Sequence, residues 1–363
     1  MRKIIFVLCV VLNIYAVQVN AISAVSAVLI DGNSGRILYE KNANQRMPMA
    51  STTKIMTGLL ACESGKLNDT VKTSAFASGT EGSSLWLKIG EKQTLKNLTY
   101  GLMLKSGNDA AVVIAEHLGG STEAFALLMN KRARVIGAVN TNFKNPHGLD
   151  AEDHYTTAYD LSLIAMESMK NEKFREIVST KTYSIPMEGE KWDRALKNHN
   201  KLLWQYDGCN GVKTGFTKKC GRCLVSSAEK NGQRLIAVTL NAPDDWNDHK
   251  YLLNYGFENF HAETVVKKGE NIKTVIYNKK YGKKAEIVAK DDFAVSFREG
   301  DVITKKININ KIEAPLKKNT KVGKMEIFCN DEKISEIDLV ISKKIKEVTV
   351  KEKLMYFFKK LLP

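Results

Sequence analysis

Three short segments occur in a fixed order along this 363-residue chain, and they limit its fold more than any other feature. Each segment is common by chance, but together they supply a hydroxyl nucleophile, an amine base, a second hydroxyl and a group that binds anions. A fold that uses them must bring distant parts of the chain to one cleft. The segments are Ser51-Thr52-Thr53-Lys54, Ser106-Gly107-Asn108 and Lys213-Thr214-Gly215.

The first segment opens a run of apolar residues at helical spacing that ends at Gly65. This pattern predicts a buried helix with Ser51 in its first turn, and residues three apart share one face of a helix, so Lys54 lies beside Ser51. A lysine becomes a base near neutral pH when burial or a nearby cation lowers its pKa. The buried helix supplies the first cause and Lys213 the second. The alternative is a helix-terminal serine beside a snorkelling lysine.

The second segment lies between two helical runs, at residues 95–104 and 110–118, which predicts a tight turn. In that turn Ser106 would pass a proton to a leaving amine, and Asn108 would hydrogen-bond the substrate's backbone amide. The alternative is a capping serine and a turn-forming asparagine.

The third segment belongs to an extended stretch that is followed by expected strands at 223–228 and 234–240, joined through Asn231-Gly232. An edge strand here would let a peptide substrate add alongside it, while Lys213 and Thr214 take its terminal carboxylate. Gly215 would leave room for that approach. The alternative is a solvated lysine on an edge strand.

With these motifs the chain resembles the active-site serine penicillin-binding proteins, specifically the low-molecular-mass D-alanyl-D-alanine carboxypeptidases, which are fold relatives of the serine β-lactamases. The resemblance covers about residues 22 to 260. It implies that Ser51 is the acylated nucleophile, Lys54 the base and Ser106 the proton relay. It implies substrate-binding roles for Asn108, Lys213, Thr214, Gly215 and Phe216, with the backbone N–H groups of Ser51 and Phe216 as oxyanion hole. Further signature segments are Ser84-Leu85-Trp86-Leu87, Gly101-Leu102-Met103-Leu104, Asn145-Pro146-His147-Gly148-Leu149, His154-Tyr155-Thr156-Thr157-Ala158 and Asn241-Ala242-Pro243-Asp244-Asp245-Trp246.

The activity that the resemblance implies is removal of the terminal D-alanine from peptidoglycan pentapeptides, without metal or cofactor and with β-lactam antibiotics as inhibitors. Gly107 stands where many β-lactamases have aspartate, which favours a carboxypeptidase. A DD-endopeptidase, a β-lactamase and a non-catalytic wall-binding protein remain the alternatives. Some members hold the carboxylate with an arginine after the third motif, and the acidic stretch at 244–248 offers no clear counterpart.

The chain divides by composition into four expected segments. Residues 1–21 contain two basic residues, then an apolar run, and end in small residues. This pattern predicts a signal peptide, and a retained membrane anchor is the alternative. Residues 22–261 predict the catalytic domain, an α+β, β-lactamase/transpeptidase-like antiparallel sheet flanked by helices. It begins with a hairpin at 24–40 that joins the later strands. Residues 262–345 predict a small β-rich domain.

The last segment, residues 346–363, predicts an amphipathic helix on the outer face of the cytoplasmic membrane of a bacterium, to which the protein is exported. A helix packed on the β-rich domain is the alternative. The formal charge of +15 fits contact with acidic membrane or wall polymers, and no basic stripe with stacking aromatics indicates nucleic-acid binding. Five cysteines follow the signal peptide, an odd count that leaves at least one thiol without an intramolecular partner. The apolar face comprises Leu354, Met355, Phe357, Phe358, Leu361 and Leu362.

Overall fold

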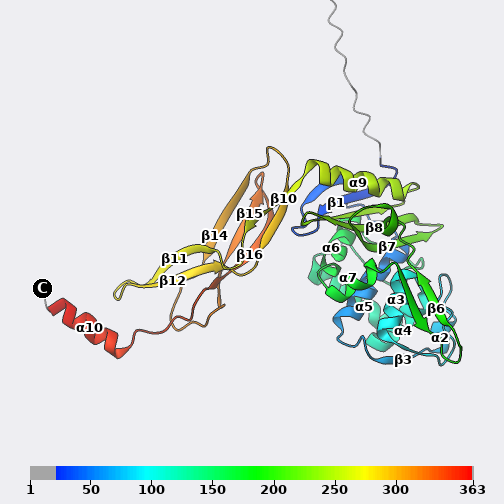
Figure 1. Ribbon diagram of the computed structural model, residues 1–363, viewed down its shortest axis with the longest axis horizontal. Coiled ribbons are helices and arrows are strands. Elements are labelled where there is room, and N and C mark those ends of the chain that lie inside the picture. The colour runs from blue at the N-terminus through cyan, green and yellow to red at the C-terminus, as the bar shows by residue number, and fades with distance from the viewer. Residues whose placement is uncertain (1–21, 362–363) are drawn as a thin grey trace, which may run out of the picture.

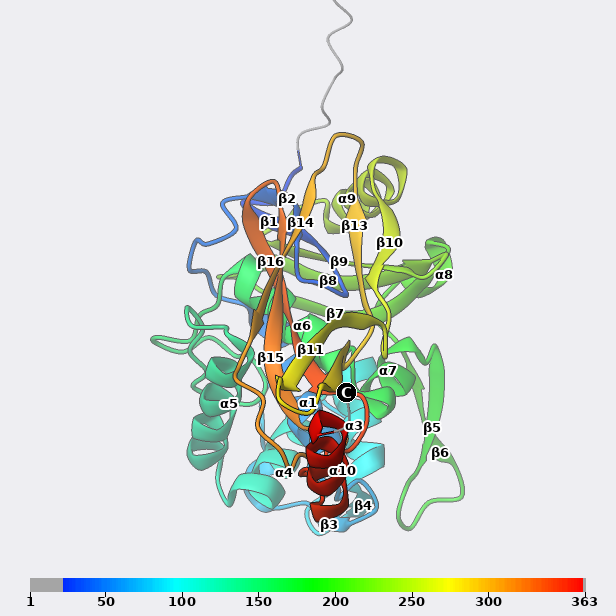
Figure 2. The same cartoon turned by 90° about the vertical axis from the view of Figure 1, so that its left-hand side faces the viewer.

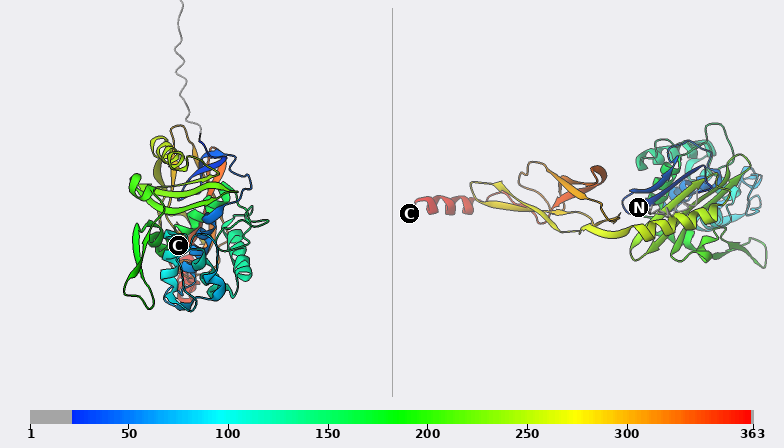
Figure 3. Two further views of the ribbon diagram at one scale, coloured as in Figure 1. Left: turned by 90° about the vertical axis from the view of Figure 1, so that its right-hand side faces the viewer. Right: turned by 90° about the horizontal axis from the view of Figure 1, so that it is seen from above.

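The computed structural model describes residues 22–361, so the predicted signal peptide lies outside the described residues. Two bodies follow one another along the long axis of the molecule, as Figure 1 and the view from above in Figure 3 show. A helix, α10 (Val350–Leu361), forms the end of the chain farthest from the first body, and Figure 2 views the molecule from that end.

The first body is built on a five-stranded antiparallel sheet with the order β2-β1-β9-β8-β7. The predicted hairpin is confirmed, since it pairs through β1 with β9 and so joins the later strands in one sheet. Strand β7, which carries the third motif, lies at the edge of the sheet as predicted. The strands are β1 (Ser26–Asp31), β2 (Ile37–Lys41), β7 (Cys209–Thr217), β8 (Gly221–Lys230) and β9 (Gln233–Leu240).

Helices cover both faces of this sheet (Figure 1). Alternate residues of β1 point to opposite sides, so Val28 packs in the larger core under the helical lobe while Leu29 packs in a second core with Leu252. The second core is closed by α9 (Asp245–Asn259), which the sequence analysis did not predict. The helical lobe comprises η1 (Ala50–Thr53), α1 (Lys54–Glu63), α2 (Ala75–Ser78), α3 (Leu95–Leu104), α4 (Asn108–Gly119), α5 (Thr122–Ile136), α6 (Ala158–Ser168) and α7 (Glu172–Ser179).

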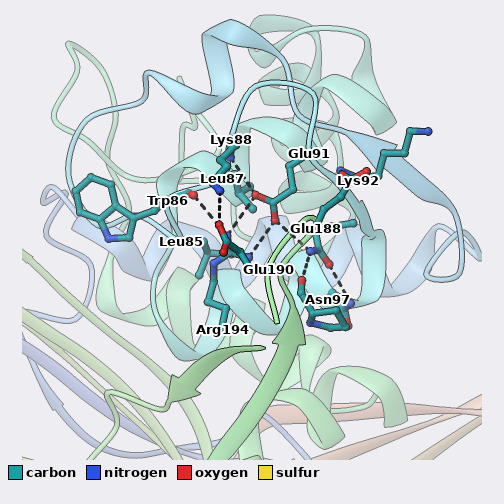
Figure 4. Close-up of polar contacts among 12 residues, drawn as sticks. Leu85, Trp86, Leu87, Lys88, Glu91, Lys92, Asn97, Glu188, Glu190 and Arg194 are labelled. Carbon is teal, nitrogen blue, oxygen red and sulfur yellow. Dashed lines mark hydrogen bonds and ion pairs between the residues drawn. The ribbon is translucent and has the colours of Figure 1, made fainter. Parts of the chain in front are cut away.

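A hairpin outside the main sheet, β5 (Thr182–Pro186) with β6 (Asp193–Lys197), is fixed on the helical lobe by ion pairs. Arg194 Nη1 lies 3.1 Å from Glu91 Oε1, and both side chains are largely buried. Lys88 pairs with Glu190 at 2.8 Å nearer the tip (Figure 4). The hairpin leads into a short helix, α8 (Leu202–Gln205), and the lobe also carries the small ladder of β3 (Thr70–Lys72) and β4 (Lys92–Thr94).

The second body is β-rich, as predicted, and has its own apolar core around Ile287, Met325 and Leu339. Its sheet has the order β11-β12-β16-β15-β14, beside a separate pair, β10 with β13. An ion pair joins it to the first body, with Arg36 Nη1 2.7 Å from Asp301 Oδ2. The strands are β10 (His261–Val266), β11 (Asn271–Asn278), β12 (Lys283–Ala289), β13 (Phe293–Phe297), β14 (Ile303–Ile309), β15 (Lys321–Cys329) and β16 (Glu332–Ile341).

Candidate active site

Ser51 lies in η1, a single 3-10 turn that runs directly into α1, rather than inside the α-helix itself. Lys54, the first residue of α1, directs its side chain back toward this turn. Its Nζ donates a hydrogen bond to Ser51 Oγ at 3.0 Å, so the two groups share one face as expected. The geometry therefore places an amine within proton-transfer distance of a hydroxyl.

The Lys54 ammonium is completely buried, and two further acceptors surround it. Nζ donates to Asn108 Oδ1 at 2.7 Å and to the His147 carbonyl at 2.6 Å. Burial lowers the pKa of Lys54 well below 10.5, and the neighbouring Lys213 lowers it further, while Asp109 opposes both. Both causes proposed from the sequence thus act, with burial the larger. A lysine whose neutral form is favoured is able to accept a proton from a hydroxyl.

Lys213 in β7 is a second buried amine beside the same cleft, with 1% of its surface exposed. Burial lowers its pKa from 10.5 to about 7, and its Nζ donates to the Thr214 carbonyl at 2.9 Å. Two ammonium groups close together in a dry region repel each other. The cleft is therefore more stable when Lys54 and Lys213 share one charge than when both lysines are protonated.

The second motif forms the opposite wall of the cleft. Ser106 sits at the turn between α3 and α4 with a positive φ of 64°, and its hydroxyl is buried without a hydrogen bond to any residue within 22–361. Asn108 starts α4, and both ends of its amide are engaged: Oδ1 accepts from Lys54, and Nδ2 donates to the Glu81 carbonyl at 2.6 Å. Asn108 thus orients Lys54, a contact that the sequence analysis did not anticipate.

Two glycines let three backbone segments meet at Ser51. Gly148 has a φ of +90°, and a Cβ there would lie 1.9 Å from the Ala50 carbonyl oxygen. A Cβ at Gly215 would lie 3.1 Å from the Ser51 nitrogen. The edge strand β7 and the loop at 145–149 therefore both press against the turn that carries the serine.

Two histidines of the signature segments, His147 and His154, lie in the wall behind Lys54. His154 Nδ1 accepts from the Lys144 N–H at 3.0 Å, and its Nε2 lies 2.8 Å from Thr53 Oγ1. Burial lowers the pKa of His154 to about 4 and that of His147 to about 3. Both rings are neutral near pH 7, so they add no charge to the site.

The motifs open onto a pocket of about 290 Å³, which is lined by Ser51, Ser106 and Thr214, one residue from each motif. Gly215 and the largely exposed Phe216 also line it. A small molecule in this pocket would therefore lie beside all three motifs, which come from the helical lobe and from the sheet.

An arginine that the sequence analysis missed completes this pocket. Arg222 in β8 lines it together with Asp245 and Trp246 from the start of α9. Its Nη2 lies 2.8 Å from the buried Asp245 Oδ1, and its guanidinium is 5.7 Å from the Trp246 ring centre. The acidic stretch at 244–248, which offers no arginine of its own, instead orients one from the neighbouring strand. The strand register, with Arg222 opposite Phe216, is the signal that would have found it.

The five cysteines of the described region are all free thiols. Burial raises the pKa of the Cys223 thiol to about 12 and that of Cys209 to about 11. Within residues 22–361 no group of three or more His, Cys, Asp or Glu side chains is arranged to hold a metal ion.

Comparison with known proteins gives two family matches. Residues 13–244 match the family model of D-alanyl-D-alanine carboxypeptidase, and residues 260–347 match the C-terminal domain of penicillin-binding protein 5. The chain is 35% identical over 338 residues to D-alanyl-D-alanine carboxypeptidase DacF of Bacillus subtilis, covering 89% of this chain and 86% of that one. It is 32% identical over 354 residues to DacC of Escherichia coli, with 91% and 86% covered.

A solved structure has the same architecture. Penicillin-binding protein 5 from Haemophilus influenzae superposes with a TM-score of 0.74 at 30% identity, covering 90% of this chain and 98% of that one. Both bodies of the fold are therefore shared, and not only the catalytic half. The sequence, the fold and the convergence of the three motifs lead to one conclusion: this chain belongs to the D-alanyl-D-alanine carboxypeptidase family of penicillin-binding proteins.

Proposed function

We propose that this chain is a serine DD-carboxypeptidase that removes the terminal D-alanine of peptidoglycan pentapeptides through an acyl-enzyme on Ser51. The observation that carries the proposal is the 3.0 Å contact between Ser51 Oγ and the buried Lys54 amine. Lys54 takes the serine proton as Oγ attacks the carbonyl carbon before the last residue. Ser106 passes a proton to the departing amine, and water then hydrolyses the ester.

The backbone N–H groups of Ser51 and Phe216 form the proposed oxyanion hole. Gly215 supports this assignment, because its close contact with the Ser51 nitrogen brings the strand that carries Phe216, one donor, beside Ser51, the other donor. Hydrogen-bond donors fixed before the reaction stabilise the developing charge without reorganisation.

The terminal carboxylate is held by three groups in this proposal: the Thr214 hydroxyl, the Lys213 ammonium and the Arg222 guanidinium. A carboxylate entering beside Lys213 favours the charged lysine, which otherwise has a pKa of about 7. Arg222 supplies a permanent charge that does not depend on pH. Asn108 has a dual role, with its amide holding Lys54 and facing the substrate's own amide.

The first prediction concerns Ser51. Ser51→Ala should lose stable labelling by fluorescent penicillin and should release D-alanine from a pentapeptide roughly 10⁴-fold more slowly than the parent protein. Both reactions need the same acylated oxygen. Gel fluorescence measures the label and a coupled assay measures free D-alanine, with Ser64→Ala, at the far end of α1, as the matched control.

Three outcomes separate the alternatives. Labelling without release of D-alanine would support an endopeptidase or a wall-binding protein. Rapid loss of the label, with release of hydrolysed penicillin, would support a β-lactamase. Undiminished labelling of Ser51→Ala would contradict the acyl-enzyme proposal altogether.

The second prediction concerns Arg222. Arg222→Gln should lower kcat/KM for a D-Ala-D-Ala peptide by roughly 10- to 100-fold, because a charge-assisted hydrogen bond to the substrate carboxylate is lost. The same variant should have little further effect on a peptide whose terminal carboxylate is amidated, since that partner is already absent. Arg134→Gln in α5 is the control. An equal loss on both peptides would contradict the assignment of Arg222 to the carboxylate.

The chain's segments have separate uses in this proposal: export by 1–21, catalysis by 22–261, a β-rich spacer at 262–345 and membrane contact by 346–363. Within residues 22–361 no single helix is long and apolar enough to cross a membrane. Helices α4 and α5 reach the length and apolar composition of a membrane span only when they are taken together, and they are bent by 80° relative to each other. Contact by α10 lying flat in the interface is the form of association that its length permits.

The contacts of α10 support this use. Its polar side faces the β-rich body, with Glu352 paired to Lys283 and the Tyr356 ring 5.1 Å from that of Tyr281. On the opposite side, more than half of the surface of Leu354, Phe357 and Phe358 is exposed in the described part of the chain. A helix that packed on the domain through its apolar face would bury these residues. Location on the outer face of the cytoplasmic membrane follows as the proposed site of action.

The third prediction concerns this helix. The mature protein should float with vesicles that contain anionic phospholipid, and Phe357→Ser/Phe358→Ser should weaken its partitioning by roughly 1,000-fold, because each buried phenylalanine contributes about 2 kcal/mol. Phe76→Ser, an equally exposed aromatic of the catalytic body, is the control. Unchanged flotation of the double variant would contradict membrane contact through α10.

A further inference from the structure

A second pocket, of about 590 Å³, adjoins the catalytic pocket and shares His199 with it. Three lysines and a tryptophan line this second pocket, which we call the lysine pocket: Lys105, Lys197, Lys201 and Trp204. No step of the proposed hydrolysis of a D-Ala-D-Ala peptide uses these four residues.

The position of the lysine pocket along β7 shows which part of a substrate it faces. Phe216, near the end of β7, provides the proposed oxyanion donor, and Thr214, nearer the start, takes the carboxylate of the leaving residue. The wall of the lysine pocket is tied to the strand still nearer its start, where Asn200 Nδ2 donates to the Gly211 carbonyl at 2.8 Å. A substrate that lies along β7 therefore extends toward the lysine pocket in the direction that runs from its scissile carbonyl to its terminal carboxylate.

The pocket carries positive charge only. No Asp or Glu of the described chain lines it. His199 adds no charge, because burial and the cations Lys213 and Lys105 lower its pKa to about 4. The Lys197 ammonium lies 5.6 Å from the ring centre of Trp204, and that of Lys201 lies 5.9 Å from Trp246 at the catalytic pocket. A site of this composition attracts anionic groups and offers an aromatic surface beside them.

Buried hydrogen bonds hold the wall of the pocket in place. Asn198 Nδ2 donates to the carbonyls of Val178 and Thr180, and the His199 N–H donates to the Leu104 carbonyl at 3.1 Å. The strand that delivers Lys197 belongs to the hairpin that Arg194 and Glu91 anchor (Figure 4). The lysines therefore extend from a fixed frame, which reduces the ordering cost of binding.

We propose that the lysine pocket receives the side chain of a leaving group longer than D-alanine that carries a further carboxylate, such as the amine-donating half of a cross-linked peptide. This inference rests on the proposed function. The chemistry is the same: Ser51 Oγ bonds to the D-alanyl carbonyl carbon, the C–N bond breaks, the amine leaves with a proton from Ser106, and water releases the acyl group as a carboxylate. Only the recognition of the departing residue is new.

Three substrates that share the same acyl half test the role of the lysine pocket. Their leaving residues are D-alanine, D-2-aminoadipate and the side-chain amide of D-2-aminoadipate, the last two nearly equal in shape and different in charge. The parent protein should cleave the acid with a kcat/KM roughly threefold or more above that of the amide, as expected for partly exposed charge pairs. In Lys197→Gln/Lys201→Gln this ratio should fall to about one. Lys66→Gln/Lys131→Gln, two exposed lysines in the helical lobe, should keep it.

Equal rates on acid and amide with the parent protein would overturn the inference, and so would a ratio that survives in Lys197→Gln/Lys201→Gln. Release of D-alanine from the first substrate separates these results from the proposed function. If the parent protein releases D-alanine and shows no preference for the acid, only the lysine pocket loses its role; if it releases none, the proposed carboxypeptidase fails first and the inference with it.

Discussion

The burial of two lysines beside one serine is the constraint on which the rest of this structure depends. Lys54 and Lys213 come from different layers, one from the first helix of the lobe and the other from the edge strand of the sheet, and both are removed from water. A lysine in water near pH 7 is protonated and is no base. The fold that buries both amines therefore creates the chemistry, and the tight contacts of Gly148 and Gly215 around Ser51 are the means by which three segments meet there.

This arrangement is costly for stability, and the surrounding architecture offsets it. Buried amines disfavour their charged forms, so the folded state is penalised at every pH below the ordinary lysine pKa of 10.5. Helices on both faces of the sheet supply two apolar cores in compensation. The polar groups around Lys54 are matched, because Ser51, Asn108 and the His147 carbonyl accept its three donors. Function and stability thus compete at this cleft.

The sequence predicts much of this molecule because its signals are local. Helical spacing located α1, α3 and α4, the turn Asn231-Gly232 located the β8–β9 hairpin, and the spacing of Ser51 and Lys54 predicted their contact. The missing elements depend on tertiary contacts. Helix α9 begins in an acidic stretch with weak periodicity, and Arg222 reaches the cleft only because the β7–β8 register and the buried Asp245 direct it there. Asn108 was assigned to the substrate alone, since nothing local indicates its bond to Lys54.

The central claim is that Lys54 is neutral when the serine is acylated while Lys213 holds the remaining charge. The most direct measurement is the second-order rate constant for labelling by fluorescent penicillin as a function of pH. The rate should rise with pH through a Lys54 pKa well below 10.5 and should fall again above about pH 7, as Lys213 loses the proton that attracts the anionic ligand. A rate that climbs steadily to about pH 10 would contradict the account, because it would show an ordinary lysine as the base.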